Sequence, residues 1–225
     1  WAHLGTEHIV APEASRNADH HITPTYVGRL LSALTLYHSR DGGPLWKESA
    51  ERMVDGMIDL AVDRGRYAYF SPMPIWAQKG STVDGGKQSA LQGAASTIAV
   101  LGLTHVYRQT GYEPAFQLAE KLVRYVLDEV RYFDGEGRFM RDEPGDTGLG
   151  QRAHFHEHTR DLQAFLEYAQ VTGDSSLLEL VPKGYEYAKA HGNVLLGYFP
   201  EFVDSPQLEH SELCGVADMI ALGVK

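Results

Sequence analysis

Apolar residues recur at helical spacing in successive pairs of segments along the chain. A stripe from Val27 to Leu34 lies on one face of a predicted helix, which ends at the Asp-Gly-Gly segment 41–43. Pro44 then opens a second helix, because proline is tolerated in a first helical turn. The aromatic segment 66–70 follows as a short extended or loop segment. The pattern predicts one helical hairpin followed by a loop.

The same pattern occurs twice more before a seventh helix begins. Each copy has two amphipathic segments separated by a polar turn, and a loop or extended stretch follows it. The elements predicted in this way are a helix over 88–107, a helix from Glu113, a glycine-rich loop over 133–139, a helix from His156, a helix over 176–190, an extended stretch over 193–202 and a helix from Glu212.

Repeated helical hairpins bury their apolar faces mainly against their neighbours. With long aromatic loops between them, they predict an all-α fold of the α/α-toroid type, the (α/α)6 barrel. An open solenoid is the alternative, but its repeats are usually nearer ~35–45 residues. A closed ring of six hairpins needs roughly twice this chain length. We therefore predict that residues 1–225 form a single toroid domain truncated after the start of its fourth hairpin, which the rest of the polypeptide or a second subunit completes.

The amino-acid composition limits the classes of binding partner, but it says less about the reaction that the protein catalyses. The 225 residues include 20 basic and 30 acidic side chains, a formal net charge of −10. This balance argues against nucleic acid and membrane as partners, since both select for basic surfaces. No apolar run approaches the length of a membrane span, and no signal peptide is visible, so the localisation stays open. A single cysteine excludes an internal disulfide framework.

The stretch 200–214 holds the residues best suited to metal binding or acid/base catalysis. Glu201 and Glu212 lie eleven positions apart, and the only cysteine, Cys214, follows Glu212 by two. A Glu-x-Cys pair can supply a carboxylate oxygen and a thiolate sulfur to zinc, while a separate glutamate acts as acid and base. The alternative is a buried cysteine at a helix start beside a solvated glutamate. Positions two apart on a regular helix point in nearly opposite directions, so a shared metal requires an irregular turn.

Three histidines, His154, His156 and His158, form a second cluster. On a helix His154 and His158 share a face and His156 points away, whereas on an extended stretch all three share one. The apolar stripe that follows places His158 on the buried side. It either contacts a ligand or hydrogen-bonds neighbouring backbone. The spacing is not that of a His-Glu-x-x-His metal site, which argues against zinc at this cluster.

Other candidates lie in the predicted loops and at helix starts. Trp76 is either a platform on which a sugar ring stacks or ordinary core. Neither a phosphate-binding glycine loop nor a nucleophilic serine elbow is present in the sequence. The remaining polar candidates are His20, His21, Asp84 and Lys87.

Several of these segments together resemble the zinc-dependent β-L-arabinofuranosidase family of glycoside hydrolases and its relatives. The resemblance covers most of the chain, and its most specific parts are the helix that begins at His158-Thr159-Arg160 and the Glu212-Leu213-Cys214 pair. The other segments that carry it are 25–34, 57–61 with 67–70, and 90–95 with 107–111, and the helix from His158 matches as far as residues 171–174.

The resemblance implies an (α/α)6 barrel, with Glu212 and Cys214 as zinc ligands and Glu201 as general acid/base. His158 would bind the sugar. The family's nucleophile is a zinc-bound cysteine farther along the chain, which reacts as a thiolate and gives retention through a thioglycosyl intermediate. The other residues that we assign to substrate binding are His156, Lys87, Trp76 and His210.

The sequence departs from the family at three places. No second or third cysteine is present, so this chain alone does not complete the family's zinc site. Lys87 stands where the family carries a histidine, and Glu201 lies closer to Glu212 than the family's acid does. The leading hypothesis is a glycoside hydrolase that acts on a glycan or oligosaccharide. The alternatives are a sugar epimerase or unsaturated uronyl hydrolase that uses histidines without metal, and a non-catalytic glycan-binding toroid fragment.

Overall fold

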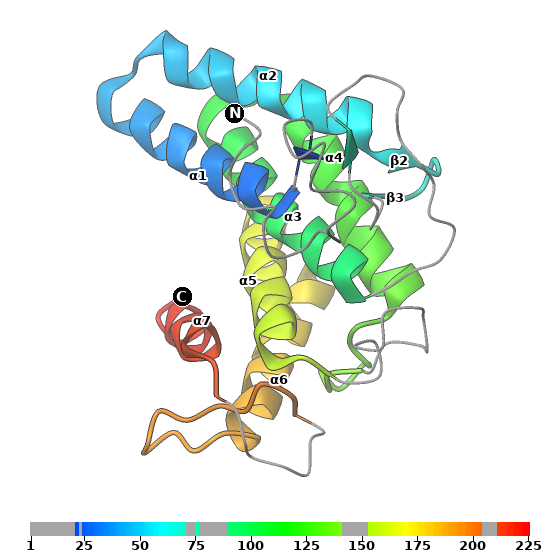
Figure 1. The fold of residues 1–225 in the computed structure, drawn as a ribbon, viewed down its shortest axis with the longest axis vertical. Helices are drawn as coiled ribbons and strands as arrows, with labels where there is room; N and C mark the ends of the chain where they lie inside the picture. Colours follow the sequence, from blue (N-terminus) through cyan, green and yellow to red (C-terminus); the bar gives the residue numbers. More distant parts are fainter. Residues whose placement is uncertain (1–20, 23, 71–74, 77–89, 141–152, 204–210) are drawn as a thin grey trace.

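The computed structural model describes residues 21–22, 24–70, 75–76, 90–140, 153–203 and 211–225, and these residues are mainly helical (Figure 1). The prediction of an all-α fold built from helical hairpins is confirmed. The helices are α1 (Pro24–Asp41), α2 (Pro44–Leu60), α3 (Ala90–Thr110), α4 (Glu113–Arg124), α5 (Phe155–Thr172), α6 (Ser175–Ala190) and α7 (Leu213–Gly223), and a π-helical segment, η2 (Tyr125–Val130), extends α4.

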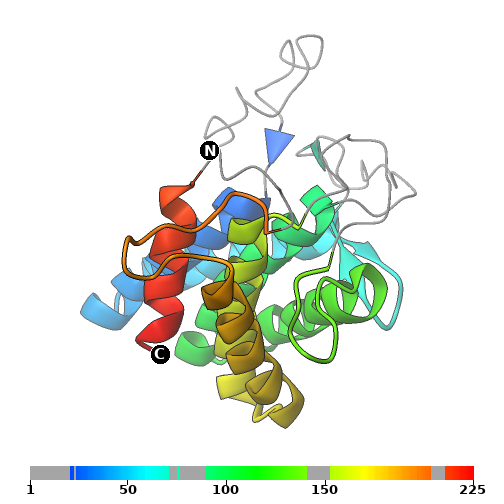
Figure 2. The same cartoon turned by 90° about the horizontal axis from the view of Figure 1, so that it is seen from below.

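The helices form two layers that alternate along the chain. In the first layer α1 packs on α3, α3 on α5 and α5 on α7. The second helix of each hairpin packs on the first, so that α2 covers α1, α4 covers α3 and α6 covers α5 (Figures 1 and 2). Two layers of this kind are the arrangement expected of part of an α/α toroid. Completion of the ring by further polypeptide or by a second subunit stays a prediction.

Turn chemistry and close packing account for the hairpins. Pro44 occupies the first turn of α2, as predicted. Gly173 ends α5 in the left-handed conformation at φ 72°, and the Asp174 carboxylate then caps α6. At the α1–α3 crossing, a Cβ on Gly102 would lie 2.2 Å from the Gly28 carbonyl oxygen, so only glycine permits this approach.

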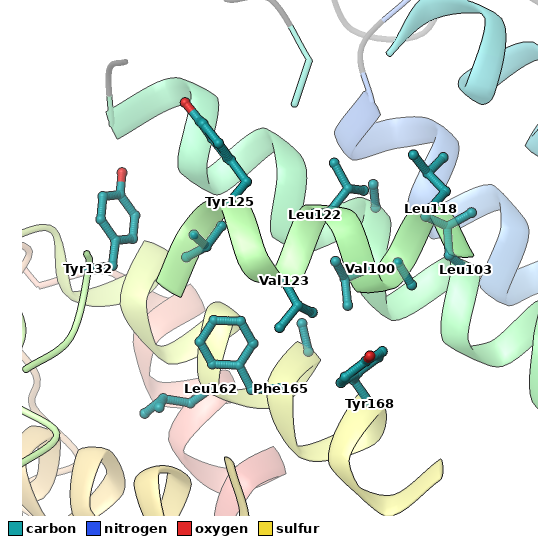
Figure 3. Packing of buried hydrophobic residues seen from close by; sticks show 14 of the residues in the cluster. Val100, Leu103, Leu118, Leu122, Val123, Tyr125, Tyr132, Leu162, Phe165 and Tyr168 are labelled. Atoms are coloured by element: carbon teal, nitrogen blue, oxygen red, sulfur yellow. The ribbon is translucent and has the colours of Figure 1, made fainter. Parts of the chain in front are cut away.

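The core lies between α3, α4 and α5. Figure 3 shows Val123 of α4 facing Phe165 of α5, and both side chains are buried. Full burial of a side chain of this size contributes about 1.5–3 kcal/mol. These contacts fix α5, whose N-terminal end carries the histidine cluster.

Short strands occupy some of the loops. The strand β2 (Val62–Asp63) pairs antiparallel with β3 (Ala68–Tyr69), and β3 lies within the segment 66–70 predicted to be extended or loop. The strand β1 (His21–Ile22) pairs antiparallel with β4 (Ile75–Trp76). None of the helices that the structure describes is long and apolar enough to cross a lipid bilayer.

The stretch 193–202, predicted to be extended, is only partly so. Residues 193–198 form a tight turn closed by the bridge between Asn193 and Tyr198. After this turn, isolated antiparallel bridges join Phe202 to His154 and Pro200 to Ser211. The segment 199–203 therefore runs between the beginnings of α5 and α7.

Candidate functional site

The site forms where α5, the segment 199–203 and α7 meet. The backbone of this segment pairs with residues 153–155 on one side and with Ser211 on the other. The Phe155 N–H donates to the Glu201 carbonyl at 2.8 Å, which fixes the backbone that carries the Glu201 side chain. Because α7 packs on α5, the residues just before both helices lie beside this segment (Figure 2).

Four side chains with metal-ligating or acid/base chemistry converge at this place. One donor atom from each of His154, Glu201 and Glu212 lies within 4.8 Å of the other two. His154 Nε2 lies 3.5 Å from Glu212 Oε2. The Cys214 thiol donates to the same oxygen, with 3.3 Å between Sγ and Oε2. The structure thus brings His154, Glu201 and Glu212 together and places Cys214 beside Glu212.

An irregular turn lets Glu212 and Cys214 meet. Glu212 is the N-cap residue of α7, and its backbone is extended, at φ −103° and ψ 129°. It therefore lies outside the helical geometry in which residues two apart diverge. Gly215 follows at a close contact with α5, since a Cβ there would lie 2.9 Å from Phe155 Cδ1.

His154 is held in one orientation by the start of α5. As the N-cap residue, it accepts the Glu157 N–H on Nδ1 at 3.3 Å. A neutral imidazole that accepts on Nδ1 carries its proton on Nε2, which faces Glu212. An N-cap contact of this kind is worth about 1 kcal/mol. Burial lowers the pKa of His154, opposed by the nearby Glu212 carboxylate.

The Cys214 thiol is protonated at neutral pH. Burial, together with the hydrogen bond to the Glu212 carboxylate, raises its pKa to about 11. The thiol is therefore a poor nucleophile as the site stands, since the thiolate is the reactive form. A bound divalent cation reverses this balance, because a coordinating thiol loses its proton.

A polar network behind this cluster ties α7 to α5. The Asp218 carboxylate accepts from His156 Nδ1 at 2.5 Å, from Thr159 Oγ1 at 3.1 Å and from Gln163 Nε2 at 2.8 Å. Arg160 Nη1 lies 3.2 Å from His156 Nε2, and a guanidinium can only donate. Both ring nitrogens of His156 are thus engaged within the protein. The substrate contact predicted for His156 stays a prediction, while its observed role is to fix the α5–α7 pair.

His158 is enclosed in the core. Its side chain is 2% exposed and stacks on the Phe139 and Tyr132 rings, at centroid distances of 4.6 and 4.8 Å. Nδ1 lies 2.7 Å from the His154 carbonyl, and Nε2 lies 3.1 Å from the Met140 carbonyl. Burial lowers its pKa to about 4, so the ring is neutral at neutral pH. Of the two alternatives for His158, the geometry shows the hydrogen-bonded backbone contact.

The remaining predicted residues cannot be placed relative to the cluster. Lys87 and His210 lie outside the described residues, as do His20 and Asp84. For Trp76 the structure gives the backbone pairing with His21. Their substrate contacts stay predictions.

Two residues of the site were not identified from the sequence, namely His154 as a neighbour of Glu212 and Asp218 as the anchor of α7. The available signal for Asp218 was a single charged residue in the otherwise apolar segment 213–224. For His154 it was a polar residue directly before a helix, at the position of an N-cap.

Glu212 is spaced from His154 and from Cys214 as two ligands of one zinc ion are, but among the described residues His154 and Cys214 do not belong to one group of donors within 4.8 Å. Zinc bonds are about 2.0–2.1 Å to nitrogen or oxygen and about 2.3 Å to sulfur, which places two ligand atoms of a tetrahedral site about 3.3–3.6 Å apart. The distances from Glu212 Oε2 to His154 Nε2 and to Cys214 Sγ, 3.5 and 3.3 Å, fall in this range.

No protein-family model matches the sequence, and a comparison with curated proteins finds no match. Among solved structures, the chain is similar to a crystal structure of a sugar epimerase from a ruminal bacterium, with a TM-score of 0.61 and 15% sequence identity. The similarity covers 81% of this chain and 48% of the epimerase chain, so this chain spans about half the length of that protein. At this identity the comparison shows a shared helical fold, and the resemblance to the arabinofuranosidase family stays a prediction.

Proposed function

We propose that this chain carries part of the active site of a carbohydrate-active enzyme, a glycoside hydrolase of the β-L-arabinofuranosidase type. The observation that carries the proposal is that Glu201 and Glu212, eleven positions apart in the sequence, meet between two helices, with Cys214 hydrogen-bonded to Glu212. The fold shared with a sugar epimerase supports a carbohydrate substrate, a glycan or an oligosaccharide.

Glu201 is the acid/base in this proposal. Its side chain is half-buried, and its carboxylate lies within 4.8 Å of the donor atoms of His154 and Glu212. A carboxyl group placed in this way protonates the leaving oxygen of a glycosidic bond and then accepts a proton from the attacking water. Glu212 and Cys214 would hold the zinc ion. When bound, zinc supplies positive charge that keeps a cysteine sulfur in its thiolate form.

A panel of nitrophenyl glycosides, including the β-L-arabinofuranoside, tests this function with the full-length protein. We expect Glu201→Gln to lower kcat by about 10²- to 10⁴-fold, the usual contribution of general acid–base catalysis. The loss should be smaller for a dinitrophenyl glycoside, whose leaving group needs less protonation. Glu179→Gln is the matched control, since Glu179 is exposed on α6 away from the cluster. Unchanged turnover in Glu201→Gln removes Glu201 from the mechanism.

A sugar epimerase is the second candidate, and the fold shared with a solved sugar epimerase supports it. Such an enzyme can move a proton between carbon and a histidine without a metal. The two reactions differ in heavy water, because this epimerisation introduces deuterium at the sugar carbon and hydrolysis does not. Activity that survives chelators and gives deuterated sugar would replace the hydrolase proposal. Binding of a glycan without turnover would instead indicate the non-catalytic alternative.

A further inference from the structure

We propose that Arg160 determines substrate specificity by binding the carboxylate of an acidic sugar unit, a uronate, with Arg29 beside it as a second cation. This inference rests on the proposed carbohydrate function and names the class of sugar that the site takes. The resemblance to the arabinofuranosidase family assigns neither arginine such a role.

Arg160 lies on a polar face of α5. Four polar residues at intervals of four, three and four positions share this face, namely His156, Arg160, Gln163 and Glu167. A different face of α5 packs on α6, where a Cβ on Gly184 would lie 2.7 Å from Leu162 Cδ2. The polar face instead contacts α7 through His156 and α3 through Glu167. Arg160 therefore lies where α3, α5 and α7 face one another.

The Arg160 guanidinium keeps unused hydrogen-bond donors. Its side chain is half-buried, and Nη1 lies 3.2 Å from His156 Nε2. A guanidinium carries five N–H groups and accepts no hydrogen bond. Among the residues that the structure describes, none supplies a carboxylate that forms an ion pair with Arg160. A half-buried cation of this kind is placed to bind an acceptor from outside the chain.

A second cation lies close to the first. Burial lowers the pKa of Arg160, and the positive charge of Arg29 lowers it further. Arg29 is an exposed residue of α1, and both α1 and α5 pack on α3. The charges of Asp218 and Asp161 oppose this lowering, but both carboxylates already accept hydrogen bonds from threonine side chains. An anion bound at the two arginines would offset their repulsion.

A carboxylate matches these cations better than a hydroxyl group does. The planar guanidinium can bind a carboxylate through two parallel N–H bonds, and charge-assisted hydrogen bonds are roughly twice as strong as neutral ones. The net charge of −10 opposes the long-range attraction of an acidic glycan. Screening by salt weakens this repulsion beyond about 8–10 Å, so the two arginines govern the contact at short distances.

Arg160 lies at the edge of the candidate site. It contacts His156, the ring centroid of which is 6.3 Å from that of His154. His154 in turn lies 3.5 Å from Glu212. A glycan bound across this row can place a carboxylate on Arg160 and a glycosidic oxygen beside Glu201. The two histidine rings keep the bound carboxylate apart from the two glutamates.

Calorimetric binding of single sugars to the full-length protein tests the proposal without requiring turnover. The probes are D-galacturonate and D-glucuronate, with D-galactose and D-glucose as neutral counterparts and inorganic phosphate as an anion without a sugar. We expect the wild type to bind at least one uronate about tenfold or more tightly than its neutral counterpart. Arg160→Gln should lower the uronate affinity by about 10- to 100-fold, the contribution of a hydrogen bond to a charged group, and should abolish the preference over the neutral sugar.

Three further variants separate binding from folding. Arg160→Lys keeps the charge but loses the planar fork, so its uronate affinity should lie between those of the wild type and Arg160→Gln. Arg29→Gln, at an exposed position, should lower the uronate affinity by about two- to fivefold. These two variants decide the matter if Arg160→Gln fails to fold. Arg124→Gln is the matched control, because Arg124 pairs with Glu120 on α4 at 2.8 Å.

Equal affinity of the wild type for uronates and neutral sugars, or a uronate preference that survives in Arg160→Gln, overturns the inference. Phosphate that binds as tightly as the uronates and is lost in Arg160→Gln would overturn the uronate assignment. Neutral glycosides cleaved through Glu201, with no uronate preference, would overturn only this inference. A uronate bound through Arg160, with every glycoside left intact, would overturn only the proposed hydrolysis.

Discussion

Replacing Asp218 by asparagine should loosen α7 from α5 and so disturb the site indirectly. The carboxylate accepts three hydrogen bonds, from His156, Thr159 and Gln163. Its side chain is only 14% exposed, so water replaces these partners poorly. Asparagine keeps one acceptor oxygen and turns an amide toward the other donors.

The expected loss in the free energy of unfolding follows from these contacts. A hydrogen bond to a charged group contributes about 1.5–3 kcal/mol. Loss of one such bond, with strain in a second, predicts a decrease of about 2–4 kcal/mol in the free energy of unfolding. For a domain of this size, 1 kcal/mol shifts Tm by roughly 2–4 °C, so Tm should fall by about 5–15 °C.

Thermal and urea unfolding of the wild type and of Asp218→Asn measure this effect. Asp128→Asn is the control, because Asp128 forms an exposed pair with Arg66 at 3.4 Å. Exposed pairs contribute about 0–1 kcal/mol. A double-mutant cycle with His156→Gln should give a coupling free energy of about 0.5–3 kcal/mol. A Tm for Asp218→Asn within about 2 °C of the wild type would refute the reasoning.

Two further predictions concern Cys214 and Glu167, the pKa values of which are shifted by their surroundings. In chelator-treated protein, the rate of Cys214 alkylation should rise with pH with a midpoint near the pKa of about 11. Glu212→Gln should lower that midpoint. A midpoint at the usual value of a cysteine in the wild type would contradict the burial of the thiol and its hydrogen bond to Glu212. The side-chain contact with His105 and the contacts with Lys225 lower the pKa of the buried Glu167 carboxyl to about 2. Because the folded pKa lies below the unfolded one, this stabilisation, about 2–3 kcal/mol, is present above pH 4.5 and is lost as the pH falls toward 2. Glu167→Gln should therefore destabilise the protein more at pH 7 than at pH 2 in urea unfolding, and an equal effect at both pH values would contradict the assignment.

The sequence predicted the helices well because their apolar residues recur with a clear period, although in α7 the structure buries Met219 and Leu222 and exposes Leu213, Ile220 and Val224. The resemblance also joined Glu201 to Glu212 and Cys214, and the structure places Glu201 beside Glu212, while the roles of these residues stay predictions. The irregular turn needed at Glu212 could be stated only as a condition, since the extended N-cap depends on the bridge between Pro200 and Ser211. Tertiary contacts of this kind leave no local periodic signal.

Histidine roles were the least predictable. The sequence placed His158 on the buried side, and the structure encloses it between aromatic rings. His154 came to the site through backbone pairing with Phe202, a partner 48 positions away in the sequence. Adjacent histidines thus have different environments, because helix geometry and loop pairing separate their side chains.

X-ray absorption at the zinc edge of the zinc-loaded, full-length protein tests the central claim most directly, because it identifies the atoms bound to the metal. Zinc held by Glu212 and Cys214 predicts a sulfur shell at about 2.3 Å together with oxygen ligands at about 2.0–2.2 Å. The sulfur contribution should decrease in Cys214→Ser. A wild-type spectrum with no sulfur ligand would show that Cys214 does not hold the metal, and would contradict the account.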